Sequence, residues 1–97
     1  MLIQTGHVGA DVRDPAWTLA AGNGPREFRQ YVSFSTPFAD TPQVMLGITH
    51  LDVSKDRNLR VSVLARDVTK SGFNVVIGTW ADTQMWGGSV DWMAFHP

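Results

Sequence analysis

The sequence contains no cysteine and only one glutamate, Glu27, among its 97 residues. The lack of cysteine excludes disulfide bonds, thiol catalysis and zinc sites with cysteine ligands. Positive charge is not in excess either, since 8 lysine and arginine residues stand against 9 aspartate and glutamate residues, for a formal net charge of -1. Nucleic acids and anionic membranes are therefore not expected as partners, because both are recognised through concentrated positive charge.

Long apolar segments are missing as well. No run approaches the roughly 20 apolar residues that a membrane-spanning helix needs, so we expect no insertion into a membrane. Residues 1–7 do not show a basic segment followed by an apolar run, which is the pattern of a signal peptide. These residues therefore give no evidence of export, and the cellular location stays open.

The sequence also lacks the common catalytic and metal-binding motifs. It has no glycine-rich phosphate loop before a helix and no nucleophile elbow. His7, His50 and His96 do not have the spacing of metal ligands. Residues 52–58 offer oxygen donors but lack the central glycine and distal glutamate of a calcium loop. We expect no catalytic residue, metal or cofactor, although the scattered aspartates do not by themselves exclude the carboxylate pair of a glycosidase.

What the sequence does have is a two-residue alternation of apolar and polar side chains, which is typical of β-strands. No window of useful length has helical periodicity. Turn-forming residues such as Asp40-Thr41-Pro42 and Lys70-Ser71-Gly72 separate the alternating segments. The expected strands lie near residues 2–8, 27–34, 44–51, 59–66, 73–78 and 89–94. This pattern predicts an all-β fold, a six-stranded antiparallel β-sandwich that forms a single domain over residues 1–97.

Four tryptophans and five phenylalanines are a large aromatic content for so short a chain. Trp92 alternates with polar residues on a predicted strand, and we expect it in the core. Trp80 fits either a core position or an exposed wall of a binding site. Trp86 falls in a predicted loop, where a large ring is harder to bury. Arg60 offers a planar fork of donors, but its place on the same strand face as Ser62 also fits an ordinary solvated surface.

Several short motifs, in their order along the chain, resemble the H-type lectin family, which includes snail agglutinins and the C-terminal domains of slime-mould discoidins. The resemblance covers nearly the whole chain, and its specificity comes from the ordered set rather than from any one motif. Those motifs are Gln4-Thr5-Gly6, Arg26-Glu27, Pro42-Gln43-Val44, Ile48-Thr49-His50-Leu51-Asp52, Asn58-Leu59-Arg60-Val61, Gly72-Phe73, Thr79-Trp80-Ala81-Asp82-Thr83 and Val90-Asp91-Trp92-Met93-Ala94.

The resemblance implies a lectin that assembles into trimers or hexamers and binds N-acetylgalactosamine or galactose between neighbouring protomers. Arg60 and Trp80 match sugar-binding residues of the family, and Trp86 falls where the snail lectin has a binding tyrosine. Asn23 falls where that lectin has a binding aspartate. The sugar-binding positions carried over to this chain are Ala21, Gly22, Asn23, Arg60, Trp80, Ala81 and Trp86.

Two of these positions depart from the family pattern. Ala81 stands where the snail lectin has a histidine, so one polar sugar contact is missing. Asn23 replaces an acceptor-only carboxylate by an amide that both donates and accepts. The sequence therefore predicts a non-enzymatic, multivalent lectin with glycans and other copies of the chain as partners. By resemblance it would agglutinate or adhere to cells, and act as a secreted or cell-surface protein. The alternative is an assembly module that kept the sandwich and lost sugar binding.

Overall fold

The computed structural model describes all 97 residues, which form strands and connections without any helix. Accordingly, the structure contains no helix that could cross a membrane. The strands are β1 (Leu2–Asp11), β2 (Arg26–Ser33), β3 (Gln43–Val53), β4 (Ser62–Arg66), β5 (Gly72–Thr79) and β6 (Met85–His96). The six-stranded, all-β sandwich predicted from the alternation is confirmed.

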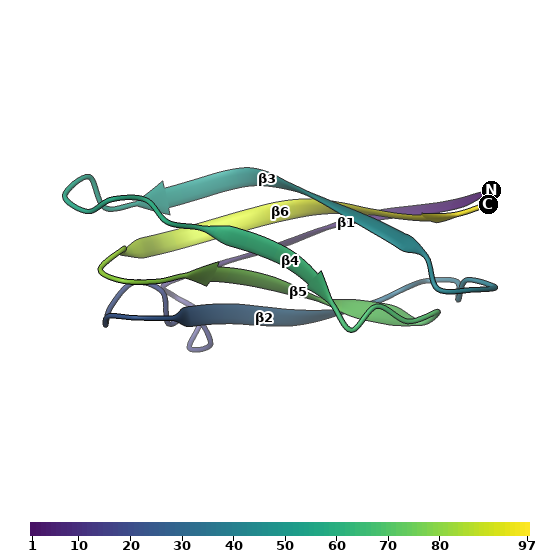
Figure 1. Cartoon of the computed structure of the whole chain (residues 1–97), viewed down its shortest axis with the longest axis horizontal. Helices are drawn as coiled ribbons and strands as arrows, with labels where there is room; N and C mark the ends of the chain where they lie inside the picture. The colour runs from purple at the N-terminus through teal and green to yellow at the C-terminus, as the bar shows by residue number, and fades with distance from the viewer.

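The strands form two three-stranded sheets, ordered β1-β6-β3 and β2-β5-β4, in which all pairs are antiparallel. Figure 1 shows the sheets as two layers, with β6 central in one and β5 central in the other. The register between β3 and β6 shifts between Ile48 and His50 and again between Asp52 and Val53. At the second shift Asp52 pairs with Gly87 and Val53 with Met85, so Trp86 is the extra residue of a β-bulge on β6.

The core lies between the layers and is filled by the inward-facing residues of both sheets. Phe73 at the start of β5 is fully buried, and its ring centroid lies 5.4 Å from that of Trp92. Phe34 packs against both rings, at centroid distances of 5.6 Å and 5.8 Å. Trp92 is only 8% exposed, which confirms its expected place in the core. Aromatic pairs of this kind add to the free energy gained by burying their area.

Gly6 is a position where this core requires the absence of a side chain. It pairs with Trp92 across β1 and β6, and a Cβ added at Gly6 would lie 2.6 Å from atoms of the indole ring. The Trp92 ring therefore lies against the Gly6 backbone. Gly47 on β3 differs, because a Cβ added there would meet nothing within 4 Å.

Three connections meet at one end of the sandwich, opposite the two termini (Figure 1). They are residues 12–25, 54–61 and 80–84, and we call this region the loop end. The strand expected near residues 59–66 begins only at Ser62. The reason is that side chains of the β5–β6 region bond to the preceding backbone: Thr79 Oγ1 donates to the carbonyl of Arg60 at 2.5 Å, and Thr83 Oγ1 to that of Asn58 at 2.6 Å. Arg60 therefore lies in the loop end rather than on a strand face.

Candidate functional site

Arg60 is held in place by side chains of the β5–β6 connection. Its Nη1 donates to Asp82 Oδ1 at 2.8 Å and to Thr83 Oγ1 at 3.1 Å. The Arg60 side chain is 27% exposed, so a solvated strand face does not describe its position. The hydrogen bond from Arg60 lowers the pKa of Asp82 below its ordinary value of 3.8. Nη1 makes both contacts, and the N–H groups of Nε and Nη2 donate to no other group of the chain.

The loop that carries Asn23 is joined to the β5–β6 connection by its backbone. Gly22 and Gly24 flank Asn23 with φ angles of 89° and 83°, a conformation that glycine adopts without strain. The N–H of Gly24 donates to the carbonyl of Ala81 at 3.0 Å, and Ala81 itself has a positive φ of 56°. The side chain of Asn23 is exposed at this junction.

Arg26, the first residue of β2, ties the same segments together through its guanidinium. Nε donates to the carbonyl of Gly24 at 2.9 Å, and Nη2 donates to that of Ala81 at 2.8 Å. Nη1 donates to the carbonyls of Ala21 at 3.0 Å and Leu19 at 3.3 Å. Ala21, Gly22, Asn23 and Ala81 are thereby brought to one place, as their assignment to a common site requires.

Trp80 follows β5 directly and is 45% exposed, so the hypothesis that it is a core residue is wrong. Its indole borders a hollow of about 310 Å³, which we call the loop-end hollow. The other residues that line the hollow are Pro25, Arg26, Glu27, Ser62, Gly78 and Thr79. An exposed indole beside hydroxyl, carboxylate and guanidinium groups is a suitable surface for a ligand with both C–H and O–H groups.

Trp86 lies in β6 and not in a loop, so the loop predicted there is wrong; its ring is nevertheless 39% exposed, at the β-bulge. Its carbonyl accepts a hydrogen bond from the N–H of Val12 at 2.9 Å, which fixes the bulge against the end of β1. Trp86 belongs to the β1-β6-β3 sheet, whereas Trp80 follows a strand of the other sheet. The structure brings the remaining predicted positions together through Arg26, Asp82 and Gly24, but no hydrogen bond joins Trp86 to them.

Three residues that organise this region were not among the predicted site residues. Asp82 and Thr83 anchor Arg60, and Arg26 joins the Asn23 loop to Ala81. Asp82 and Thr83 belong to the motif that contains Trp80, so their proximity to the predicted site was a usable signal. Arg26 had a weaker signal, namely a basic residue directly after the Ala21-Gly22-Asn23-Gly24-Pro25 turn.

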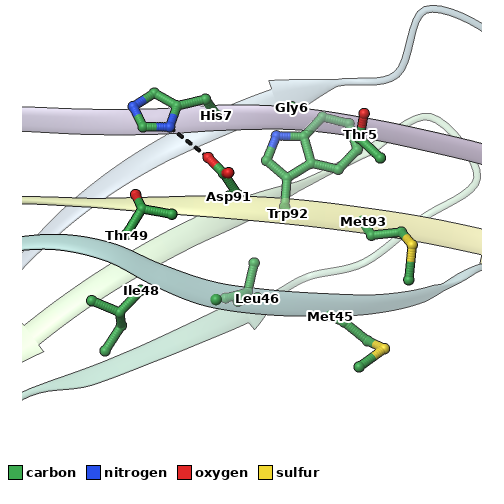
Figure 2. Close-up of a pocket in the computed structure, with 11 residues that line it drawn as sticks. Thr5, Gly6, His7, Met45, Leu46, Ile48, Thr49, Asp91, Trp92 and Met93 are labelled. Carbon is green, nitrogen blue, oxygen red and sulfur yellow. Dashed lines mark hydrogen bonds and ion pairs between the residues drawn. The ribbon is translucent and has the colours of Figure 1, made fainter.

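A larger hollow of about 670 Å³ lies on the outer face of the β1-β6-β3 sheet, and Figure 2 shows its lining. We call it the outer hollow. Its polar feature is a contact of 2.6 Å between His7 Nδ1 and Asp91 Oδ1, two exposed side chains. The only aromatic ring among its lining residues other than His7 is that of Trp92, which is buried in the core. None of the predicted sugar-binding residues lines this hollow.

No group of three or more His, Asp or Glu side chains in the structure could hold a metal ion. Buried polar side-chain atoms all have hydrogen-bond partners. Polar side-chain atoms of the loop end that lack a partner are therefore exposed ones, and with the ring of Trp80 they suit binding through hydrogen bonds and contact with an aromatic ring.

A family model, relatives identified by sequence and solved structures all relate this chain to H-type lectins or discoidins. The family model described as the H-type lectin domain matches residues 29–95. The chain is 41% identical over 78 residues to the "ATP synthase subunits region ORF 7" protein of Fuscovulum blasticum, covering 80% of this chain and 65% of that protein. It is 33% identical over 89 residues to a discoidin-1 chain of Dictyostelium discoideum, covering 90% of this chain and 35% of the relative.

Solved structures of discoidin II from the same organism superpose with a TM-score of 0.84 at 24% identity. In the recombinant protein the match covers 96% of this chain and 36% of that chain, and it supports the fold. The chain thus spans 65% of the Fuscovulum blasticum protein and about a third of the discoidins.

Proposed function

Because the chain belongs to the H-type lectin family, we propose that it is a multivalent lectin that binds terminal N-acetylgalactosamine or galactose at its loop end. The observation that carries the proposal is the position of Arg60. Its guanidinium is anchored on one side by Asp82 and Thr83, and its Nε and Nη2 groups have no hydrogen-bond partner within the chain. A site with donors fixed in advance loses little conformational entropy when a ligand binds.

Arg60 and Asn23 supply the hydrogen bonds in this proposal. The planar guanidinium of Arg60 donates to two neighbouring sugar hydroxyls in a fixed geometry. The amide of Asn23 accepts from and donates to a third hydroxyl, and so favours the axial hydroxyl of galactose-type sugars over an equatorial one. Leaving a polar partner unpaired in the bound complex costs about 1–3 kcal/mol, which is sufficient for such discrimination.

Trp80 and Trp86 supply aromatic walls, and their positions favour a site shared between protomers. Trp80 follows β5 and borders the loop-end hollow, whereas Trp86 is turned outward from β6 in the other sheet. One chain therefore presents the two rings from different layers. In our proposal Trp80 covers the sugar bound by its own protomer, and Trp86 completes the site of a neighbouring copy.

Assembly into a trimer or hexamer follows from the same proposal. The outer face of the β2-β5-β4 sheet carries Leu64 and Val76, which are register partners on β4 and β5. Val76 is already buried within the chain, whereas Leu64 is 42% exposed and is an apolar side chain that a neighbouring copy could cover. Several shallow sites on one assembly raise avidity by about 10²–10⁴ without new contacts, which is what agglutination or cell adhesion needs.

A glycan array with the labelled protein tests the proposal, with free N-acetylgalactosamine and galactose as competitors. We expect binding to terminal galactose-type sugars that both competitors abolish. An array without signal at high protein concentration would reject sugar binding and favour the assembly module. Release of the leaving group from a chromogenic galactoside would instead indicate a glycosidase.

A further inference from the structure

Arg26 makes an unusual set of contacts for a charged side chain at the edge of a sheet. It is half-buried, and its guanidinium donates four hydrogen bonds, all to backbone carbonyls. Arg26 has no carboxylate partner, unlike Arg29 on the same strand, which lies 3.5 Å from Glu27 and 3.6 Å from Asp67. The positive charge of the half-buried Arg26 guanidinium is therefore stabilised within the chain by hydrogen bonds to backbone carbonyls and not by an ion pair.

The carbonyls that Arg26 contacts belong to two separate segments of the loop end. Leu19, Ala21 and Gly24 come from the β1–β2 connection, which carries Asn23. The carbonyl of Ala81 comes from the β5–β6 connection, between Trp80 and Asp82. The sequence separation between Arg26 and Ala81 is 55 residues, so the contact joins distant parts of the chain.

The Ala81 carbonyl is the point at which the two segments meet. It accepts from Arg26 Nη2 at 2.8 Å and from the N–H of Gly24 at 3.0 Å. Asp82, the next residue, accepts from Arg60. A continuous path of hydrogen bonds and one peptide link therefore runs from the Asn23 loop through Ala81 to the guanidinium of Arg60.

We infer that Arg26 is a positioning residue that sets the distance between Asn23 and Arg60, and thereby determines how well the site distinguishes galactose-type from glucose-type sugars. This inference rests on the proposed function of the loop end. Although Arg26 borders the loop-end hollow, its guanidinium is engaged by four backbone carbonyls, so its role in this inference is to hold those carbonyls rather than to bind the sugar. Its planar fork is the feature required, because it reaches carbonyls on both segments in a fixed geometry. A lysine keeps the charge but cannot bridge several carbonyls in the same way.

The test compares Arg26→Lys with the matched control Arg29→Lys, which changes an exposed arginine on the same strand. Calorimetric titration with galactose and glucose gives both affinities and their ratio for each protein. We expect Arg26→Lys to bind galactose about tenfold more weakly, which corresponds to one misplaced hydrogen bond, and to lose most of its preference over glucose. Arg29→Lys keeps the wild-type affinity and ratio.

Hydrogen exchange at the Gly24 amide provides a readout that does not depend on sugar. In Arg26→Lys we expect this amide to exchange faster, because its acceptor on Ala81 is no longer held, while amides of β5 and β6 keep their protection. Arg26→Gln, which removes the charge, should show the same pattern with a larger change.

The outcomes separate the two hypotheses. If the wild-type protein binds no galactose-type sugar, the proposed function fails and this inference fails with it. If the wild type binds but Arg26→Lys has an unchanged affinity and galactose-to-glucose ratio, only the positioning role is rejected. If Arg26→Lys and Arg26→Gln both unfold, Arg26 is a folding residue and the inference is rejected as well.

Discussion

The loop end and the outer hollow are two recesses of the same molecule that arise in different ways. The outer hollow has the larger volume, about 670 Å³ against about 310 Å³. It lies over the outer face of the β1-β6-β3 sheet, where Gly47 on β3 leaves space that no other side chain fills. The loop-end hollow lies at the end of the β2-β5-β4 sheet, next to the connections that Arg26 and Arg60 join through hydrogen bonds.

The difference shows that volume alone does not identify a binding site. The polar pair of the outer hollow, His7 and Asp91, consists of two exposed side chains that satisfy each other. At the loop end, by contrast, the Arg60 guanidinium is anchored by Asp82 and Thr83, in the same connection that carries the exposed ring of Trp80. Fixed polar groups and an aromatic wall are what a specific small-ligand site requires.

The largest expected effect is the loss of sugar binding in Arg60→Ala. Removing two hydrogen bonds from a charged donor costs about 3 kcal/mol or more, so affinity for galactose-type sugars should fall about 100-fold. Calorimetric titration measures it, with size-exclusion chromatography to show that the variant still folds and assembles. Asp91→Ala at the outer hollow is the control and should bind like the wild type. Equal affinity in the wild type and in Arg60→Ala would show that Arg60 does not bind the sugar.

A second comparison uses two glycines of the β1-β6-β3 sheet. Gly6→Val forces a side chain into the Trp92 ring and should lower the free energy of unfolding by about 1–3 kcal/mol. Gly47→Val enters open space, so its free energy of unfolding should change by less than about 0.5 kcal/mol. Urea denaturation followed by tryptophan fluorescence measures both. Gly47→Val also fills part of the outer hollow. Since the proposed sugar site is at the loop end, the sugar affinity of this variant should equal that of the wild type. A loss of affinity would indicate that the sugar binds at the outer hollow instead.

Asp82→Asn weakens the anchor of Arg60 without touching the sugar. We expect about a tenfold loss of affinity, since a neutral amide holds the guanidinium less firmly than a carboxylate. The pKa of Asp82 is lowered in the folded protein, so the carboxylate and its contact with Arg60 persist above pH 3.8 and are lost as the pH falls through the lowered pKa. Wild-type affinity should decline only in that acidic range, and affinity of Asp82→Asn should not show this decline. A wild-type decline already between neutral pH and pH 5 would contradict this account.

The smallest expected effect concerns specificity at Asn23. Asn23→Asp replaces the amide by a carboxylate, which only accepts hydrogen bonds. A hydrogen bond to a charged group is stronger than one to a neutral amide by about 1 kcal/mol, so affinity for N-acetylgalactosamine should rise about fivefold. Competition on a galactose-coated surface measures the change. No gain would mean that the Asn23 side chain does not contact the sugar.

Most of the fold was predictable because it depends on local alternation. The segments near Phe28, Phe73 and Trp92 alternate clearly, and each one became a strand with the predicted face in the core. The start of β4 was not predictable in this way. Alternation continues through Arg60, but hydrogen bonds from Thr79 and Thr83, which lie about twenty residues later in the chain, remove that segment from the sheet.

The candidate site was predictable only in part, and for a related reason. Resemblance to a family marks individual positions such as Arg60, Trp80 and Asn23, and the structure places these at one end of the sandwich. The resemblance does not reveal which hydrogen bonds hold these positions together. Arg26 acts on backbone carbonyls, which every residue has, so no pattern of side chains in the sequence could reveal what Arg26 contacts.

The most direct test of the central claim follows the four tryptophan indole N–H signals by NMR during titration with N-acetylgalactosamine. Single Trp→Phe variants assign the signals. We predict that the signals of Trp80 and Trp86 move with sugar concentration. Those of Trp17, whose Nε1 donates to the carbonyl of Met85 at 2.8 Å, and of buried Trp92 should stay in place. A saturable shift of the Trp92 signal alone, which would report on the outer hollow that Trp92 lines, or no shift in any indole signal, would contradict a sugar site at the loop end.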